Sequence, residues 1–482
     1  MPSIKTEIIK GSIWIAIAKY SGIIVNLIIT AILARLISPS AFGTIAVAIV
    51  ILSFLNIIAD IGIGPAVVQY KSLTNHHLNS LFTLNIYIGI TLSLVFFSMS
   101  SVIADYYGDL SLEKVCQMMS LVVLFNSLNV VPNALMRKDK RFKAIALRTL
   151  SIQVTSGSIA VWGAFHGWGI YALMVSPIIT SIGVFLINYY NYRLRYVLRM
   201  SNEAIKMVSS YSFFQFAFSF VNYFSRNLDK LIIGKYFSLT QLGYYDKSYH
   251  LMILPLQNVT FVIEPVLHPI LSSLQDNKQE LAKKNIKLAR IISNISFPLG
   301  VLLYFCGAEI IRIVYGNQWD AAIPVFCILA LSLPLQMIQS TSGAIYQAAG
   351  KTNHMFYNGI SNTTVTTSGF VIAAYYFGTI ESMAWAWNIT LAFNFIISYF
   401  ILYKFTMKES VLPYFRALIP QLFNSTIVFV ILNACTPLFE QNNLVINIFI
   451  KFTFVSLLTL LFAFAFNQYR IKDVYKIFIK PR

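Results

Sequence analysis

The stretch ILARLISPSAFG (residues 32–43) is matched 200 positions later by IIGKYFSLTQLG (232–243), and this pair decides the fold. Ile32/Ile232, Ser38/Ser238 and Gly43/Gly243 are identical, and several of the remaining pairs, such as Arg35/Lys235, are conservative. Internal duplication of this kind is a feature of membrane transporters. The pair therefore predicts a chain built from two related halves.

The composition places both halves in a membrane. Hydrophobic residues make up 57% of the 482 residues and charged residues only 11%, with a mean hydropathy of +0.68. A soluble domain needs more charge to cover its surface. The formal net charge of +18 could indicate a nucleic-acid partner. However, the basic residues lie in short segments between apolar runs, which favours a role in membrane topology and excludes nucleic acid as the expected partner.

Apolar segments long enough to cross a bilayer recur along the whole chain. A transmembrane helix needs about 20 apolar residues. Segments of this length are too long for the strands of an outer-membrane barrel, so the sequence predicts an all-α integral membrane protein. The fourteen candidate spans are 11–33, 42–62, 81–101, 115–133, 148–165, 168–188, 208–233, 242–268, 287–306, 321–342, 355–376, 383–403, 418–437 and 446–466.

The offset of 200 divides these spans into three groups. Residues 1–200 form an N-terminal lobe (spans 1–6), residues 201–407 a C-terminal lobe (spans 7–12), and residues 408–482 carry spans 13–14 and a cytoplasmic tail. Six is an even number, so the two lobes have the same orientation and are parallel repeats. We expect a substrate cleft between them.

Lysine and arginine set the predicted orientation. With the N-terminus in the cytoplasm, most of the 36 Lys and Arg residues fall in cytoplasmic segments. Basic residues near span ends resist translocation. Both termini are therefore predicted to be cytoplasmic.

Four stretches carry a resemblance to a known family: LARLISPSAFG (33–43), ADIGIGPAVVQ (59–69), RKDKRF (137–142) and NLDKLIIGKYFSLTQLGYY (227–245). With the 6 + 6 + 2 span plan, the chain resembles the Wzx-like polysaccharide flippases (O-antigen and capsule type) of the multidrug/oligosaccharidyl-lipid/polysaccharide exporter superfamily. The resemblance implies that the protein moves an undecaprenyl-diphosphate-linked oligosaccharide across the bacterial inner membrane, by alternating access, for lipopolysaccharide or other cell-surface polysaccharide. It also implies membrane lipids, a glycan polymerase and other polysaccharide-assembly proteins as partners.

Charged residues within the spans are the candidate substrate ligands, because an ionisable group in a bilayer should face a cavity or a partner. Lys19 and Asn26 share one helical face, and the offset of 200 places Asn26 over Arg226. The two cations, Lys19 and Arg226, would suit the negative charges of a diphosphate. Asp229 is either a part of this site or a local ion-pair partner of Arg226. Lys230 lies nearer a span end, where it is a weaker candidate.

Two carboxylates beside prolines are candidates for gating or ion coupling. Asp60 precedes Pro65 near the end of span 2, and Glu264 precedes Pro265 in span 8. Both prolines are expected to disturb the helices at these ends and are gating candidates themselves. Each carboxylate could cap free backbone amides, bind a coupling cation, or pair with a cation of the other lobe. A purely structural role remains an equal alternative.

No cofactor, metal site or catalytic group is expected. The sequence contains no GxxxxGK[ST] motif, and the six His and four Cys show no metal-binding spacing. Na⁺, H⁺ or the membrane potential is therefore the predicted energy source. A small-molecule or multidrug exporter of the same superfamily is the alternative function, and a membrane-embedded glycan-processing enzyme is a lesser one.

Overall fold

The computed structural model describes residues 4–272, 274–275, 277–435 and 443–465. These residues form helices joined by short connections, with no strand among them, so the predicted all-α class is confirmed. The chain divides into two compact units, Met1–Gly243 and Tyr244–Arg482. The long helix that begins the second repeat is thus grouped with the first unit. The lobe boundary predicted at residue 200 follows the repeat, and it remains a prediction.

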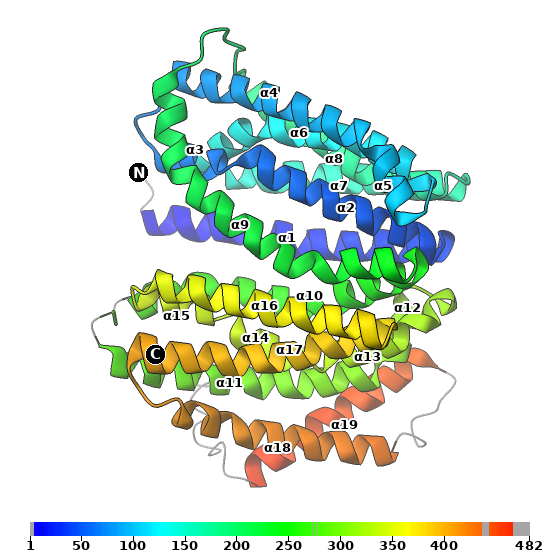
Figure 1. The fold of residues 1–482 in the computed structure, drawn as a ribbon. Coiled ribbons are helices and arrows are strands. Elements are labelled where there is room, and N and C mark those ends of the chain that lie inside the picture. The colour runs from blue at the N-terminus through cyan, green and yellow to red at the C-terminus, as the bar shows by residue number, and fades with distance from the viewer. Residues whose placement is uncertain (1–3, 273, 276, 436–442, 466–482) are drawn as a thin grey trace. The chain divides into compact units, whose positions relative to one another are not determined.

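The first unit is a bundle centred on α6 (Figure 1). Helix α6 packs against α2, α4 and α8, while α1 packs along α7 and α9 lies against α2. Asn85 fixes one of these contacts, because it exchanges hydrogen bonds with Ser127 at 3.0 and 2.8 Å. The helices of this unit are α1 (Ile4–Leu36), α2 (Pro39–Asp60), α3 (Ile63–Gln69), α4 (Asn75–Ser98), α5 (Ser100–Tyr107), α6 (Ser111–Lys138), α7 (Phe142–Phe165), α8 (Ile170–Tyr192) and α9 (Asn202–Tyr236).

The second unit is organised around α11, which packs against α13, α14, α18 and α19. Helices α16 and α17 form a separate antiparallel pair beside α13 and α14. The elements are α10 (Leu239–Ser272), which begins in the first unit, α11 (Lys278–Phe305), α12 (Gly307–Val314), the 3₁₀-helix η1 (Asn317–Ala322), α13 (Ile323–Ala330), α14 (Leu333–Gln339), α15 (Ser342–Ala348), α16 (Thr352–Tyr376), α17 (Ile380–Phe400), the π-helix η2 (Ile401–Met407), α18 (Leu412–Cys435) and α19 (Leu444–Ala465).

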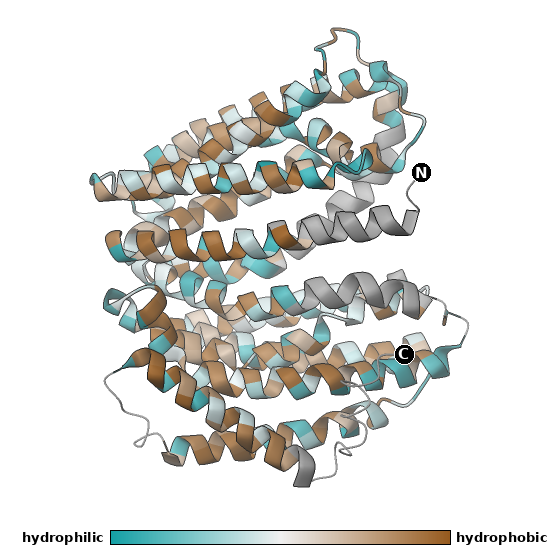
Figure 2. Ribbon diagram, turned by 180° about the vertical axis from the view of Figure 1, so that it is seen from behind, coloured by the Kyte–Doolittle hydropathy of each residue, from teal (hydrophilic) through white to brown (hydrophobic). Residues whose placement is uncertain are grey.

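Large apolar side chains cover the outside of both units. Leu94, Phe449 and Leu461 are 61%, 70% and 64% exposed, and Figure 2 shows hydrophobic residues along the length of many helices. A soluble protein does not expose apolar surface on this scale. Among the described residues, ten helices are long and apolar enough to cross a membrane, or eleven if a bent pair counts as one span. The protein is therefore a multi-pass membrane protein, and the predicted count of fourteen spans is not confirmed.

The repeated motif has the same local structure in both of its copies. Ser38 accepts a hydrogen bond from the Ala41 amide at 3.5 Å, and Ser238 accepts one from the Gln241 amide at 3.1 Å. Each serine thereby caps the helix that follows it, α2 or α10. Since equivalent serines cap equivalent helices, the local structure supports the offset of 200.

The glycines of the repeat allow these two helix starts to cross at backbone distance. A Cβ added at Gly43 would lie 1.7 Å from the Leu239 carbonyl oxygen, and one at Gly243 would lie 2.1 Å from the Pro39 carbonyl oxygen. Residues 39 and 239 are themselves related by the offset, so the contact is reciprocal. Only glycine fits at either position.

Helix α2 ends before the proline that was expected to disturb it. It stops at Asp60 because Ile61 and Gly62 adopt left-handed conformations, with φ of 41° and 75°. Pro65 lies in the first turn of α3, where a missing N–H costs little. In the second repeat, the backbone of α10 remains helical through Glu264 and Pro265 as far as Ser272, while those two side chains lie outside the described part.

The predicted span 321–342 is not one straight helix. Residues Asn317–Ala330 and Leu333–Ala348 form two segments bent by 47°. Pro334 stands in the first turn of α14 and has no N–H to bond to the Ala330 carbonyl, so one helical hydrogen bond is missing where the two segments bend. The chain crosses this region as the short helices α13, α14 and α15.

Candidate functional site

The predicted cations Lys19 and Arg226 lie on α1 and α9. Lys19 is half-buried, whereas Asn26, which shares its helical face, is exposed. Arg226 is also exposed. Both helices belong to the first unit, although the repeat assigns one of them to each lobe. The role of these residues in binding substrate stays a prediction.

Asp229 and Lys230 are in different surroundings from Arg226. Asp229 is only 4% exposed, and its Oδ1 accepts a hydrogen bond from the Lys230 amide at 2.8 Å. Lys230 is half-buried. Nearby on α9, the Tyr223 hydroxyl donates to the Val50 carbonyl of α2. This part of α9 is thus fixed against α2, while Arg226 projects from an exposed position.

Asp60 lies at the break between α2 and α3. Its Oδ1 accepts a hydrogen bond from the Gly64 amide at 2.9 Å. The carboxylate therefore caps the first turn of α3, which is one of the three roles considered for it. Its second oxygen remains available, because the capping bond uses Oδ1.

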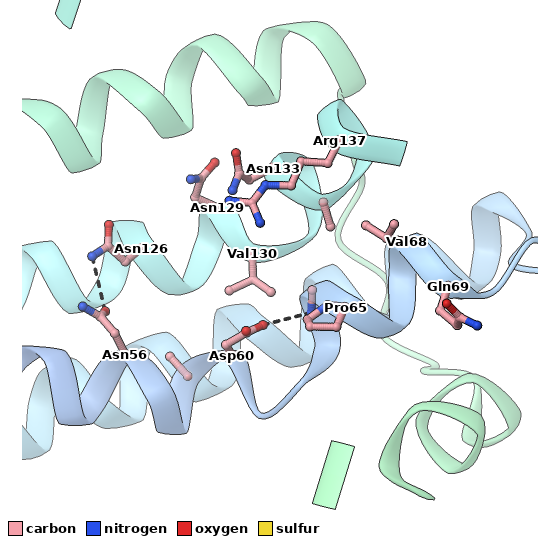
Figure 3. Close-up of a pocket in the computed structure, with 13 residues that line it drawn as sticks. Asn56, Asp60, Pro65, Val68, Gln69, Asn126, Asn129, Val130, Asn133 and Arg137 are labelled. Atoms are coloured by element: carbon pink, nitrogen blue, oxygen red, sulfur yellow. Dashed lines mark hydrogen bonds between the residues drawn. The ribbon is translucent and has the colours of Figure 1, made fainter. Parts of the chain in front are cut away.

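A polar cavity of about 690 Å³ opens beside Asp60 between α2, α3 and α6 (Figure 3). Asn126, Asn129, Asn133 and Arg137 follow one another at spacings of three and four residues on α6, so they share one helical face. Figure 3 shows Asn129, Asn133 and Arg137 gathered on the side of the cavity opposite Asp60. The polar lining consists of Asn56, Asp60, Gln69, Asn126, Asn129, Asn133 and Arg137.

A buried arginine outside the cavity orients one of these amides. Arg148 of α7 is 9% exposed, and its Nη1 donates to Asn188 Oδ1 of α8. The Nδ2 of Asn188 in turn donates to Asn129 Oδ1 at 2.7 Å. Arginine can only donate hydrogen bonds, so the direction of this chain is chemically fixed. Asn129, which lines the cavity, therefore has its Oδ1 bonded and its Nδ2, a double donor, left for another acceptor.

Charged groups of both signs lie at the cavity and behind it. Arg137 interacts electrostatically with the Asp60 carboxylate and with the Arg148 guanidinium. In the part of the chain that the structure describes, Arg148 is bonded to an amide and not to a carboxylate. The lining thus holds one arginine and one aspartate, and the buried Arg148 guanidinium lies behind it, close enough to act on Arg137.

A second cavity, of about 530 Å³, lies at the opposite end of α2. Asp109 is the charged residue of its lining, and it accepts hydrogen bonds from Thr44 at 2.8 Å and from the Ser111 hydroxyl at 2.7 Å. Burial raises the pKa of Tyr107, which also lines this cavity, to about 12. The Asp109 carboxylate is engaged in these bonds, which tie α2 to the start of α6. We therefore assign this cavity a structural role.

The second unit contains a buried ion pair between its last helix, α19, and the short helix α12. Lys451 of α19 bonds to Glu309 of α12 and to the Phe305 carbonyl oxygen at 2.7 Å. Lys451 and Glu309 are 8% and 5% exposed. This pair anchors α19 on α11 and α12. Among the described residues, no group of three or more His, Cys, Asp or Glu side chains is placed to hold a metal ion.

Sequence reasoning missed the amides of α6 and the Arg148 chain. The spacing of Asn126, Asn129 and Asn133, followed by Arg137, is a readable signal because it repeats along one helical face. These amides carry no charge, so a search for charged residues within the spans does not find them. Arg148 stands at the start of a predicted span and gave no sign of its buried partner, since Asn188 is 40 residues away.

Comparison with known proteins agrees with this architecture. Residues 32–324 match the protein family described as "Polysaccharide biosynthesis protein". The chain is 25% identical to the lipopolysaccharide biosynthesis protein WzxC of Escherichia coli (strain K12), over 86% of this chain and 85% of that protein. It is 23% identical to the teichuronic acid biosynthesis protein TuaB of Bacillus subtilis (strain 168), over 87% and 86%.

Solved structures show the same fold. The lipid II flippase MurJ, in an inward closed conformation, matches with a TM-score of 0.74 at 16% identity, over 97% of this chain and 100% of that chain. An inward-facing multidrug resistance transporter of the MATE family matches with a TM-score of 0.60 at 12% identity, over 78% and 93%. The family match covers more than half of the sequence, so the chain belongs to the polysaccharide biosynthesis protein family.

Proposed function

We propose that this protein is a flippase that moves a lipid-linked oligosaccharide from the cytoplasmic to the outer face of the membrane for cell-surface polysaccharide synthesis. The observation that carries the proposal is the polar cavity within an otherwise apolar, multi-pass bundle. Amides and an arginine in such a place bind hydroxyl and anionic groups, and a polyprenyl tail can remain in lipid. Membership of the polysaccharide biosynthesis family supports the same substrate class.

The internal repeat supports transport by alternating access. Two related halves that open in turn to either side expose one site alternately, without chemistry on the glycan. The protein is accordingly a carrier and not an enzyme. Undecaprenyl diphosphate is the carrier lipid that we propose, and both chain termini lie in the cytoplasm. Na⁺, H⁺ or the membrane potential drives the cycle, and a glycan polymerase uses the product.

Multidrug export is the alternative function. Cationic drugs require acidic or aromatic cavities. The cavity in the first unit is lined by amides, one arginine and one aspartate, which favours a hydroxyl-rich or anionic substrate over a cationic one. The shared fold with the MATE transporter does not by itself favour drugs, because one fold carries many substrates.

Deletion of the gene in its own host tests the function. We expect the lipid-linked oligosaccharide to accumulate on the cytoplasmic face while surface polysaccharide is lost, and the wild-type gene should restore export. Restoration by the Lys19→Ala/Arg226→Ala double variant should be much weaker at equal protein level, because two candidate diphosphate ligands are missing. Full export by that variant would show that Lys19 and Arg226 are not needed for transport. Unchanged surface polysaccharide in the deletion strain would refute the flippase function.

A further inference from the structure

The polar cavity presents hydrogen-bond donors on one wall and a carboxylate on the other. On the α6 side, Asn129 lines the cavity, and because its Oδ1 accepts from Asn188, its Nδ2 is left as a donor. Asn56 Oδ1 accepts from Asn126 Nδ2 at 3.3 Å, so Asn56 also keeps its amide hydrogens. On the opposite side, the Asp60 carboxylate, in its ionised form, accepts hydrogen bonds and donates none.

Arg137 adds the strongest donors. Within the described ranges of the chain, its guanidinium makes no hydrogen bond to another residue, although it lines the cavity beside Asn129 and Asn133. A guanidinium has five N–H donors in a planar fork that suits a carboxylate or phosphate. Arg148 lies outside the lining, and its hydrogen bond to Asn188 fixes which amide atom of Asn188 reaches Asn129.

We infer that this cavity is a subsite for an acidic sugar residue, with the sugar carboxylate on Arg137 and the α6 amides and a ring hydroxyl on Asp60. The inference rests on the proposed function, because it names the substrate class for the same site. A uronic acid unit carries a carboxylate and hydroxyls on one ring, and thus matches a wall of donors facing an acceptor. A volume of about 690 Å³ is ample for one or two sugar rings.

The carrier diphosphate shares the oxyanion chemistry but fits the cavity less well. It brings two negative charges and no hydroxyl, so it leaves Asp60 without a donor and places like charges close together. Asp60 cannot turn away freely, because its Oδ1 caps the Gly64 amide. The carboxylate on the wall thus favours a singly charged sugar over a diphosphate.

Transport of two matched substrates tests the inference. The full-length protein is reconstituted in proteoliposomes with lipid-linked trisaccharides that differ in one residue, glucuronate or glucose, and arrival in the far leaflet is followed with a membrane-impermeant glycosidase. Wild type should move the acidic glycan faster. Arg137→Gln should lower that rate by about tenfold, the value of one charge-assisted hydrogen bond, and should slow the neutral glycan much less.

Two further variants control for folding and for general charge. Asn129→Asp retains the bond from Asn188 but turns the cavity-facing donor into an acceptor, so it should also slow the acidic glycan selectively. Arg141→Gln removes an exposed arginine that bonds Asn191 at 3.0 Å outside the cavity, and should have no effect. All are compared at equal amounts of monodisperse protein.

The possible outcomes distinguish the acidic-sugar subsite from the proposed flippase function. Equal rates for the two glycans with wild type would overturn the acidic-sugar subsite and leave the flippase intact. An equal loss for both glycans in Arg137→Gln would assign the cavity to the diphosphate, and would overturn the inference. Movement of neither glycan by wild type would instead count against the proposed function.

Discussion

Arg148 influences a cavity that it does not line. Its side chain is buried between α7 and α8, and its hydrogen bond to Asn188 fixes the direction of the next bond, to Asn129. Burying a charge without a carboxylate is unfavourable unless its donors are bonded. The Asn188 amide, itself fully buried, therefore has a structural and a directing role at once.

Substitution of Asn188 tests this chain at the residue scale. Asn188→Leu leaves the Arg148 guanidinium and Asn129 Oδ1 without their partner, and should lower the free energy of unfolding by about 2–3 kcal/mol. The Arg148→Met/Asn188→Leu double variant removes the charge as well and should be more stable than the single variant. Thermal unfolding of the detergent-solubilised protein, followed by tryptophan fluorescence, measures both.

Asn191→Ala is the matched control for that experiment. It lies on the same helix and accepts a bond from Arg141 at an exposed site, so its effect should be within about 0.5 kcal/mol. A double variant no more stable than Asn188→Leu would show that Arg148 is not the source of the destabilisation.

At the scale of elements, the crossing of α2 and α10 is the most constrained contact of the first unit. Gly43 and Gly243 each face a backbone carbonyl oxygen of the other helix, and backbone cannot yield as a flexible side chain does. The two serine caps hold the helix starts in this position. The repeated motif thus encodes a helix crossing.

Alanine at either glycine should separate the two helices. Gly43→Ala and Gly243→Ala each place a Cβ at about half of a normal contact distance, so we expect a marked loss of thermal stability, of the size seen for overpacking, about 1–3 kcal/mol or more. Gly359→Ala, in α16 where a Cβ meets nothing within 4 Å, should be neutral or stabilising. Equal stability of all three variants would contradict a tight crossing.

Much of the element order could be predicted from sequence. The candidate spans read from hydropathy coincide with helices of the structure, and the span 321–342 coincides with a set of short helices. Hydropathy is sufficient here because a helix that crosses a bilayer needs a long apolar stretch, independent of how it packs. The end of α2 was predicted less well. Its break depends on left-handed Ile61 and Gly62 and on the Asp60 cap, whereas the prediction rested on Pro65.

The candidate site was predicted only in part, for a physical reason. Asp60 is detectable as a charge in an apolar segment, but the neutral amides of α6 cost less in a membrane and so do not stand out. Their importance comes from a hydrogen-bond chain through α7 and α8, which joins residues distant in sequence. Such long-range pairing is a property of the folded bundle.

For the whole molecule, family, fold and cavity chemistry point in the same direction. The chain belongs to a polysaccharide biosynthesis family and shares its fold with a lipid II flippase. The first unit holds a cavity rich in donors for sugar and anionic groups. Neither fold nor family alone defines a substrate, but together with this cavity they support transport of a charged glycan on a lipid carrier.

Transbilayer movement of a lipid-linked oligosaccharide by the purified protein is the most direct measurement. Proteoliposomes that contain the protein as their sole polypeptide are loaded with the oligosaccharide in the inner leaflet, an ion gradient or membrane potential is imposed, and the fraction that becomes accessible to an external glycosidase is recorded over time. The account predicts movement well above that in protein-free liposomes. A rate equal to that of protein-free liposomes, under every gradient and with both acidic and neutral glycans, would contradict it.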